Sequence, residues 1–286
     1  MSEIPNRRYY SLRTNKNPNS IQLELPIFRR LFKDIFQLFL NKEYFQEAFG
    51  YECVDAGPVA GKLGFDIEAQ ILRKLRKTNL WPIRDKCLEY SEDDIFDIIE
   101  FLFDNISKPL EGFYHDYGEC GWHYQTFNTQ LGREEYRREI NGILQDYKEG
   151  YVLSEDGEIL ALAEKGLENL FNANLPTHDP INVEARVNAA ILKFRRYKSS
   201  IDERRDAVRD LADVLEYLRP KLRAVITKSD ENDLFNIANN FGIRHHNETQ
   251  KTDYEKSIWL SWIFYYYLTT IHATIRLIKK QEESKT

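Results

Sequence analysis

The sequence predicts a mainly α-helical protein, with a helical N-terminal domain that carries a small β-hairpin and a C-terminal four-helix bundle. Three observations support this fold class. Apolar residues recur at helical spacing through most of the 286 residues. Two short apolar runs flank Ser154-Glu155-Asp156-Gly157, a pattern typical of one β-hairpin near 150–163. Four periodic segments with short connections fill residues 181–286, as in a helical bundle.

Composition fits a soluble globular protein with a substantial core, because 42% of the residues are apolar and 30% are charged. The apolar stretch 258–278 contains too many polar groups for a membrane span, among them His272 and Arg276. The N-terminus shows no secretory leader. We therefore expect a cytoplasmic protein without membrane association.

The N-terminal domain is expected over residues 21–176, after a mobile polar arm at 1–20. Pro26 favours a helix start, and Ser91 is a good N-cap with acids following it. Residues 106–132 show no period and predict a folded loop region. The expected helices lie at 26–49, 66–77, 91–105 and 133–148, with a short one ending near 172.

A linker is expected over 173–180, where Pro176 and Pro180 lie, before a C-terminal domain at 181–286. In this domain Asp202 and Ser229 are candidate N-caps, and Pro220 is expected to follow a helix end. The expected helices cover 183–197, 201–218, a third that begins at 230, and 255–280.

The charge distribution leaves two interpretations open. The formal net charge is −6, yet residues 186–228 hold twelve Lys or Arg and six Asp or Glu, a local excess of +6 that leaves −12 elsewhere. Such a segment could bind phosphate, or it could be a solvated helical surface with paired charges. The paired surface is the expected case.

Several familiar functional motifs are incomplete or absent in the sequence. Residues 57–63 resemble a phosphate-binding loop but are one residue short between the glycines and have Leu63 where a hydroxyl is needed. No Gly-x-Ser-x-Gly elbow or His-Glu-x-x-His helix occurs in the sequence. The cysteines Cys53, Cys87 and Cys120 are odd in number and widely spaced, which favours neither a disulfide framework nor a zinc ribbon.

Potential metal ligands gather in the irregular region, but their spacing matches no familiar zinc module. Aromatic neighbours favour a packed loop with satisfied histidines. We therefore expect no metal site and no cofactor. The residues concerned are His115, Asp116, Glu119, Cys120 and His123.

The tripeptide Arg244-His245-His246 is the best candidate site, because a permanent cation beside two imidazoles can hold a phosphate and move a proton without a metal. Asn240 and Asn247 could support it. The alternative is structural: the arginine pairs with carboxylates of the preceding helices, such as Asp213 and Glu216, and the histidines lie at a helix end. On residue chemistry alone, the structural alternative is favoured.

Residues 236–248, with the aromatic helix from Trp259 to Arg276 after them, resemble the HEPN domain of prokaryotic abortive-infection proteins related to AbiJ. The resemblance covers about residues 183–280. It implies a domain that dimerises and cleaves RNA without a metal. That family carries an Arg followed a few residues later by a His, whereas here two histidines follow directly. This departure fits either a variant active site or a bundle that keeps the fold without the activity.

The resemblance implies that Arg244 holds the scissile phosphate and that His245 or His246 is the general base. It further implies a homodimer formed through the C-terminal bundle, RNA as the partner, a role in anti-phage defence, and an N-terminal half that senses, regulates or binds a partner protein. Two alternatives remain: a non-catalytic dimerisation module of a defence complex, and a nucleic-acid-binding face at 186–228.

Overall fold

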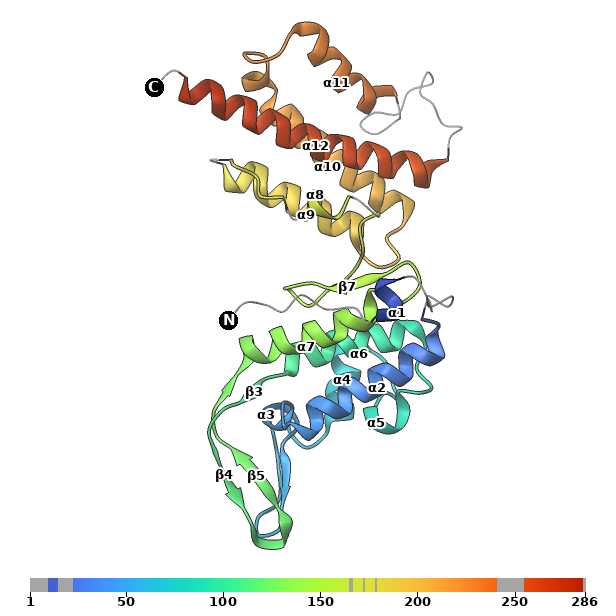
Figure 1. The fold of residues 1–286 in the computed structure, drawn as a ribbon, viewed down its shortest axis with the longest axis vertical. Helices are drawn as coiled ribbons and strands as arrows, with labels where there is room; N and C mark the ends of the chain where they lie inside the picture. Colours follow the sequence, from blue (N-terminus) through green and yellow to red (C-terminus); the bar gives the residue numbers. More distant parts are fainter. Residues whose placement is uncertain are drawn as a thin grey trace. The chain divides into compact units, whose positions relative to one another are not determined.

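The computed structural model describes residues 10–14, 23–164, 167–171, 173–177, 179–240 and 255–284. The chain divides into two compact units, Met1–Ile159 and Leu160–Thr286. Helices dominate both units, and short strands form two-stranded sheets (Figure 1). The mainly helical fold class is therefore confirmed.

The N-terminal unit is built on a bundle of helices whose inner faces carry large aromatic rings. Phe28 of α2 stacks on Tyr147 with ring centroids 4.3 Å apart, and both side chains are fully buried. Such buried rings supply most of the apolar area that drives packing. The helices are α1 (Tyr10–Arg13), α2 (Leu25–Asn41), α3 (Gln46–Phe49), α4 (Ile67–Leu75), α5 (Ile83–Lys86), α6 (Glu92–Asn105) and α7 (Thr129–Leu144).

Two helix starts follow the sequence prediction. Pro26 lies in the first turn of α2, where its missing N–H costs nothing. Ser91 caps α6 in a capping box, in which its hydroxyl accepts the Asp94 N–H. The single helix expected over 26–49 is wrong, because α2 and α3 are separated by a turn in which Glu43 has φ 62°. No glycine or proline marks that break.

The region expected to be a loop at 106–132 instead contains four strands: β3 (Lys108–Pro109), β4 (Gly112–His115), β5 (Gly121–Tyr124) and β6 (Phe127–Asn128). β4 pairs antiparallel with β5, with His115 opposite Gly121. Beside this hairpin lies a second one, formed by β1 (Tyr51–Cys53) and β2 (Gly57–Val59), and both project from the helices (Figure 1). The sequence did not predict these strands, because β4 exposes its aromatic side chains and therefore lacks the alternation of apolar and polar residues that marks a strand.

Gln46 joins the β4–β5 hairpin to the helices. Its side-chain amide donates to the Trp122 carbonyl at 2.8 Å, and its oxygen accepts the Tyr124 N–H at 2.7 Å. The buried Gln46 amide therefore bonds one backbone C=O and one backbone N–H of β5, as the backbone of a paired strand would.

The predicted hairpin near 150–163 is confirmed as β7 (Tyr151–Leu153) and β8 (Ile159–Ala161). Gly157 has φ 89°, and a Cβ there would lie 2.4 Å from the Phe103 ring. Glycine is therefore required at this turn.

The C-terminal unit contains the four expected long helices, α9 (Ala185–Arg195), α10 (Ile201–Leu222), α11 (Lys228–Asn240) and α12 (Lys256–Glu283). They follow α8 (Glu168–Phe171) and a π-helical turn, η2 (Pro180–Glu184). The expected linker at 173–180 belongs to this unit, in which Leu175 is part of the core.

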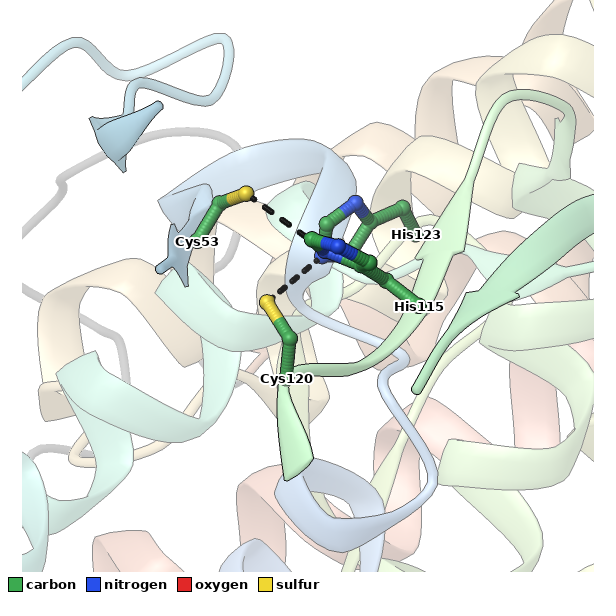
Figure 2. Close-up of side chains that lie close together, drawn as sticks. All are labelled: Cys53, His115, Cys120 and His123. Carbon is green, nitrogen blue, oxygen red and sulfur yellow. Dashed lines mark hydrogen bonds between the residues drawn. The ribbon is translucent and has the colours of Figure 1, made fainter. Parts of the chain in front are cut away.

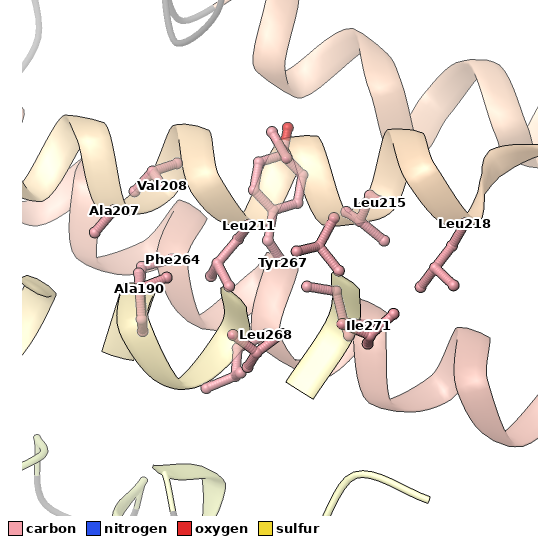
Figure 3. Packing of buried hydrophobic residues seen from close by; sticks show 14 of the residues in the cluster. Ala190, Ala207, Val208, Leu211, Leu215, Leu218, Phe264, Tyr267, Leu268 and Ile271 are labelled. Carbon is pink, nitrogen blue, oxygen red and sulfur yellow. The ribbon is translucent and has the colours of Figure 1, made fainter. Parts of the chain in front are cut away.

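Helix α10 packs against both α9 and α12, and its Leu211, Leu215 and Leu218 side chains point into the core that the three helices share (Figure 3). Leu211 and Leu215 of α10 are fully buried against the apolar faces of both neighbours. Phe194 of α9 stacks on Phe264 of α12 at a centroid distance of 4.0 Å. The small residues Ala190 and Ala207 are fully buried as well, so the helices can approach closely.

Three details of helix ends differ from the sequence expectation. Ser200, not Asp202, caps α10, in a capping box with Glu203. Pro220 lies inside the last turn of α10, which continues to Leu222. Thr227, not Ser229, accepts the Asp230 N–H at the start of α11. In the two capping cases, residues with similar capping power lie two positions apart, and sequence alone does not rank them.

Across the described ranges, no helix combines the length and the apolar character that a membrane crossing requires.

Removing the Phe264 ring tests the described core. The side chain has no exposed surface, so we expect Phe264→Ala to lower the free energy of unfolding by about 3–5 kcal/mol in chemical denaturation. The control is Leu277→Ala on the same helix, where the side chain is 42% exposed and the expected loss is below about 1 kcal/mol. Equal losses in the two variants would contradict this packing.

Candidate metal centre and the Arg-His-His segment

The residues of the predicted RNA site lie mostly outside the described residues: Arg244, His245, His246 and Asn247. Asn240 ends α11, and its side chain is also outside them. The remaining two, Asp213 and Glu216, lie half-buried on α10. Glu216 accepts two hydrogen bonds of 3.2 Å from Arg219 on the same helix.

Helix α11, which leads into the Arg-His-His segment, is tied to α10 by charge. The buried Glu231 of α11 accepts from Arg219, and from Arg223 at 2.9 Å. The Arg219 guanidinium also lies 4.3 Å from the centroid of the Phe235 ring. A carboxylate shared by two arginines and an adjacent cation–π contact fix the start of α11 on α10.

The basic stretch 186–228 is extensively paired with acids, in line with the paired surface expected from its composition. Lys193 bonds Asp210 at 2.5 Å, and Arg209 bonds Asp206 at 3.0 Å. Further ion pairs join Arg205 to Asp202, Lys221 to Glu282, and Arg219 and Arg223 to Glu231. This charge pairing reduces the positive potential that a phosphate backbone would meet.

A different cluster is fully described, in the N-terminal unit (Figure 2). Four side chains, from Cys53, His115, Cys120 and His123, converge so that one potential ligand atom of each lies within 4.8 Å of all the others. Thiolate sulfur and imidazole nitrogen are the preferred ligands of zinc in proteins. The cluster is therefore a candidate metal centre.

The two hairpins position these four residues. Cys53 ends β1, His115 ends β4, and His123 lies in β5. Cys120 is the last residue of the β4–β5 turn, directly before Gly121, which has φ 93°. This left-handed conformation favours glycine and lets the turn bring Cys120 back toward the histidines.

The ligand atoms are paired thiol to imidazole. The Cys53 Sγ lies 3.8 Å from His115 Nδ1, and the Cys120 Sγ lies 3.1 Å from His123 Nε2. Figure 2 shows both pairs meeting at one point between the hairpins.

Outer contacts orient these ligands. His115 Nε2 lies 3.2 Å from the Asp55 carboxylate, so an N–H at Nε2 leaves the Nδ1 lone pair facing Cys53. Backbone N–H groups of Ala56 and Asp55 lower the pKa of the Cys53 thiol. Desolvation raises the pKa of the Cys120 thiol. The β1–β2 turn thus supplies amides that favour a thiolate at Cys53.

His123 is the most enclosed of the four residues, with 4% of its surface exposed. Its ring lies 4.3 Å from the Tyr51 ring and 5.1 Å from the Phe113 ring, measured between centroids. Aromatic rings from β1 and β4 therefore line one side of the cluster.

Sequence reasoning found three of the four residues and missed Cys53, which lies 62 residues before His115. It also grouped Asp116 and Glu119 with them, whereas the structure does not bring these two acids into the cluster. The Cys120 and His123 spacing, Cys-x-x-His, was a usable signal. The other cysteine, at the end of β1 in a distant hairpin, can be assigned to the cluster only once both hairpins are paired.

No protein-family model, no curated protein and no solved structure matches this chain.

The Glu231 contact generates a pH-dependent prediction. Arg219 and Arg223 lower the pKa of the Glu231 carboxyl. The ionised carboxylate therefore stabilises the fold above the unfolded-state pKa of about 4.3, and this stabilisation is lost as pH falls through the lower folded-state pKa. We expect Glu231→Gln to lower the melting temperature at pH 7, and its difference from the wild type to shrink on acidification.

The control for this experiment is Glu282→Gln, because Glu282 is half-exposed and lies 3.9 Å from Lys221. An exposed ion pair of this kind contributes little to stability, so the melting temperature of Glu282→Gln should stay near the wild-type value. A Glu231→Gln effect that is absent at pH 7, or that does not change down to about pH 3, would contradict the described contact.

Proposed function

We propose that the C-terminal unit is a HEPN-like module that acts on RNA, as a metal-independent endoribonuclease in prokaryotic anti-phage defence. The observation that supports it is the position of Arg244-His245-His246 in the chain, between α11 and α12 of a helical bundle. The resemblance to the abortive-infection proteins implies an Arg/His motif in a bundle of this kind. The helices that precede and follow this segment in the chain, α11 and α12, belong to one compact unit.

The chemistry requires three actions on the RNA. His245 or His246 removes the proton of a ribose 2′-hydroxyl, and the resulting oxygen attacks the adjacent phosphorus. Arg244 holds the phosphate oxygens, where its planar guanidinium can donate two hydrogen bonds and stabilise the added charge. The 5′-oxygen leaves with a proton, so the products carry a 2′,3′-cyclic phosphate and a 5′-hydroxyl.

Substitution of the tripeptide tests this activity. With purified protein, single-stranded RNA and EDTA, we expect cleavage by the wild type and rates lower by about 10²–10³-fold for Arg244→Ala and for His245→Ala/His246→Ala. The same sequence as DNA should stay intact, because it lacks the 2′-hydroxyl. The control is Lys280→Ala, which removes an exposed cation of α12 outside the basic stretch 186–228 and should leave the rate nearly unchanged.

Three outcomes would contradict the mechanism: equal rates in all variants, no cleavage by the wild type, or activity that is lost in EDTA and restored by Mg²⁺.

A second candidate function is dimerisation through α12, which an exposed aromatic surface on this helix favours. Ile258 is 67% exposed and Trp262 is 45% exposed, and the Trp262 ring stacks on Tyr266 with centroids 5.6 Å apart. Large exposed apolar side chains near one another mark interaction surfaces. The proposed occupant is a second copy of this chain, related by a two-fold axis that would bring two Arg-His-His segments into one assembly.

Charge placed on this surface tests the dimer. In Ile258→Glu/Trp262→Glu, two carboxylates from each copy would meet in the interface, so sedimentation should show a shift from dimer to monomer. The matched control is Leu277→Glu, at an exposed apolar position on the same helix, which should leave the dimer intact. A wild type that is monomeric at all concentrations would remove this candidate.

A further inference from the structure

We propose that Cys53, His115, Cys120 and His123 bind one zinc ion that cross-links the β1–β2 hairpin to the β4–β5 hairpin. The inference is independent of the RNA proposal, because it concerns the N-terminal unit and its test measures metal rather than cleavage. It also replaces the expectation, drawn from the ligand spacing and the aromatic neighbours, of a packed loop without a metal.

The distances fit one tetrahedral ion. Zinc bonds of about 2.3 Å to sulfur and about 2.0–2.1 Å to nitrogen separate neighbouring ligand atoms by about 3.3–3.8 Å. The two thiol–imidazole pairs lie at 3.8 Å and 3.1 Å, and every pair of ligand atoms lies within 4.8 Å. Small side-chain rotations close the remaining differences.

The ligand atoms are identified by their surroundings. His115 would bind through Nδ1, because its Nε2 faces Asp55 at 3.2 Å. This carboxylate–histidine contact is the outer-shell arrangement that orients a metal-binding imidazole and raises its basicity. His123 would bind through Nε2, which already faces the Cys120 Sγ.

The ligand set favours zinc over an iron–sulfur cluster. In a two-iron cluster with mixed ligands, the cysteines bind one iron and the histidines bind the other, so each thiolate is separated from the imidazoles by the cluster. Here each thiol adjoins an imidazole. Two thiolates and two neutral imidazoles around Zn²⁺ give a neutral site, and binding releases the two thiol protons to solvent.

The site is structural, since four protein ligands fill a tetrahedral zinc and leave no position for water or substrate. Strands of three and four residues form sheets too short to be stable alone. A metal bound to both hairpins would stabilise them together, because the unfolded chain does not present the four ligands at one point.

Metal analysis of the full-length protein, purified without chelator, tests the proposal. We expect about one zinc per chain in the wild type, and at least a ten-fold lower content in Cys53→Ser and His123→Ala, which lack one ligand each. The control is Cys87→Ala, because Cys87 is a buried free cysteine outside the cluster and its variant should keep its zinc. Asp55→Asn should weaken zinc binding about 10–100-fold while leaving one ion per chain at saturation.

Two measurements on the wild type alone test the proposal even if the variants fail to fold. Native mass spectrometry should show a mass above that of the metal-free protein by one zinc ion less two protons. Replacement of the zinc by Co²⁺ should give the visible absorption of a tetrahedral cobalt–thiolate complex. Three results would overturn the proposal: no zinc in the wild type and no uptake of added zinc, a mass lower by two hydrogen atoms that indicates a Cys53–Cys120 disulfide, or iron in place of zinc.

Discussion

The convergence of two thiols and two imidazoles is the interaction on which the hairpin region of the N-terminal unit depends. The two hairpins are short, and the β4–β5 hairpin exposes about half of its Phe113, Tyr114 and Trp122 side chains. Little apolar area therefore holds these strands together. Gln46 joins the hairpin to the helices through two hydrogen bonds, and Cys53 joins it to its neighbour. A metal bound at this point would cross-link the two hairpins.

The C-terminal unit is held by a different constraint, the apolar packing of α10 against α9 and α12. Hydrophobic packing fixes these three helices. Helix α11 adds Phe235 to the same core and is also attached through the carboxylate of Glu231 and its two arginines. The charge contact depends on pH, so this part of the α11 attachment is lost when the Glu231 carboxylate is protonated. Because α11 leads directly into the Arg-His-His segment, this attachment bears on the proposed RNA chemistry.

Much of the fold could be predicted from the sequence because its signals are local. Helical periodicity gave α9, α10 and α12 to within a few residues, and Ser91 and Gly157 carried cap and turn chemistry. The break at Glu43 could not be predicted, because an ordinary residue adopts a left-handed conformation that packing imposes. Cys53 was missed for a related reason: its partners are fixed by the pairing of two distant hairpins. The roles of Arg244, His245 and His246 remain predictions.

The most direct test of the zinc centre is X-ray absorption at the zinc edge of the purified, untreated protein. We expect zinc to be bonded to two sulfur atoms at about 2.3 Å and two nitrogen atoms at about 2.0 Å, with scattering from the more distant imidazole ring atoms. A shell of oxygen and nitrogen alone would contradict it, because zinc would then be bound without Cys53 and Cys120.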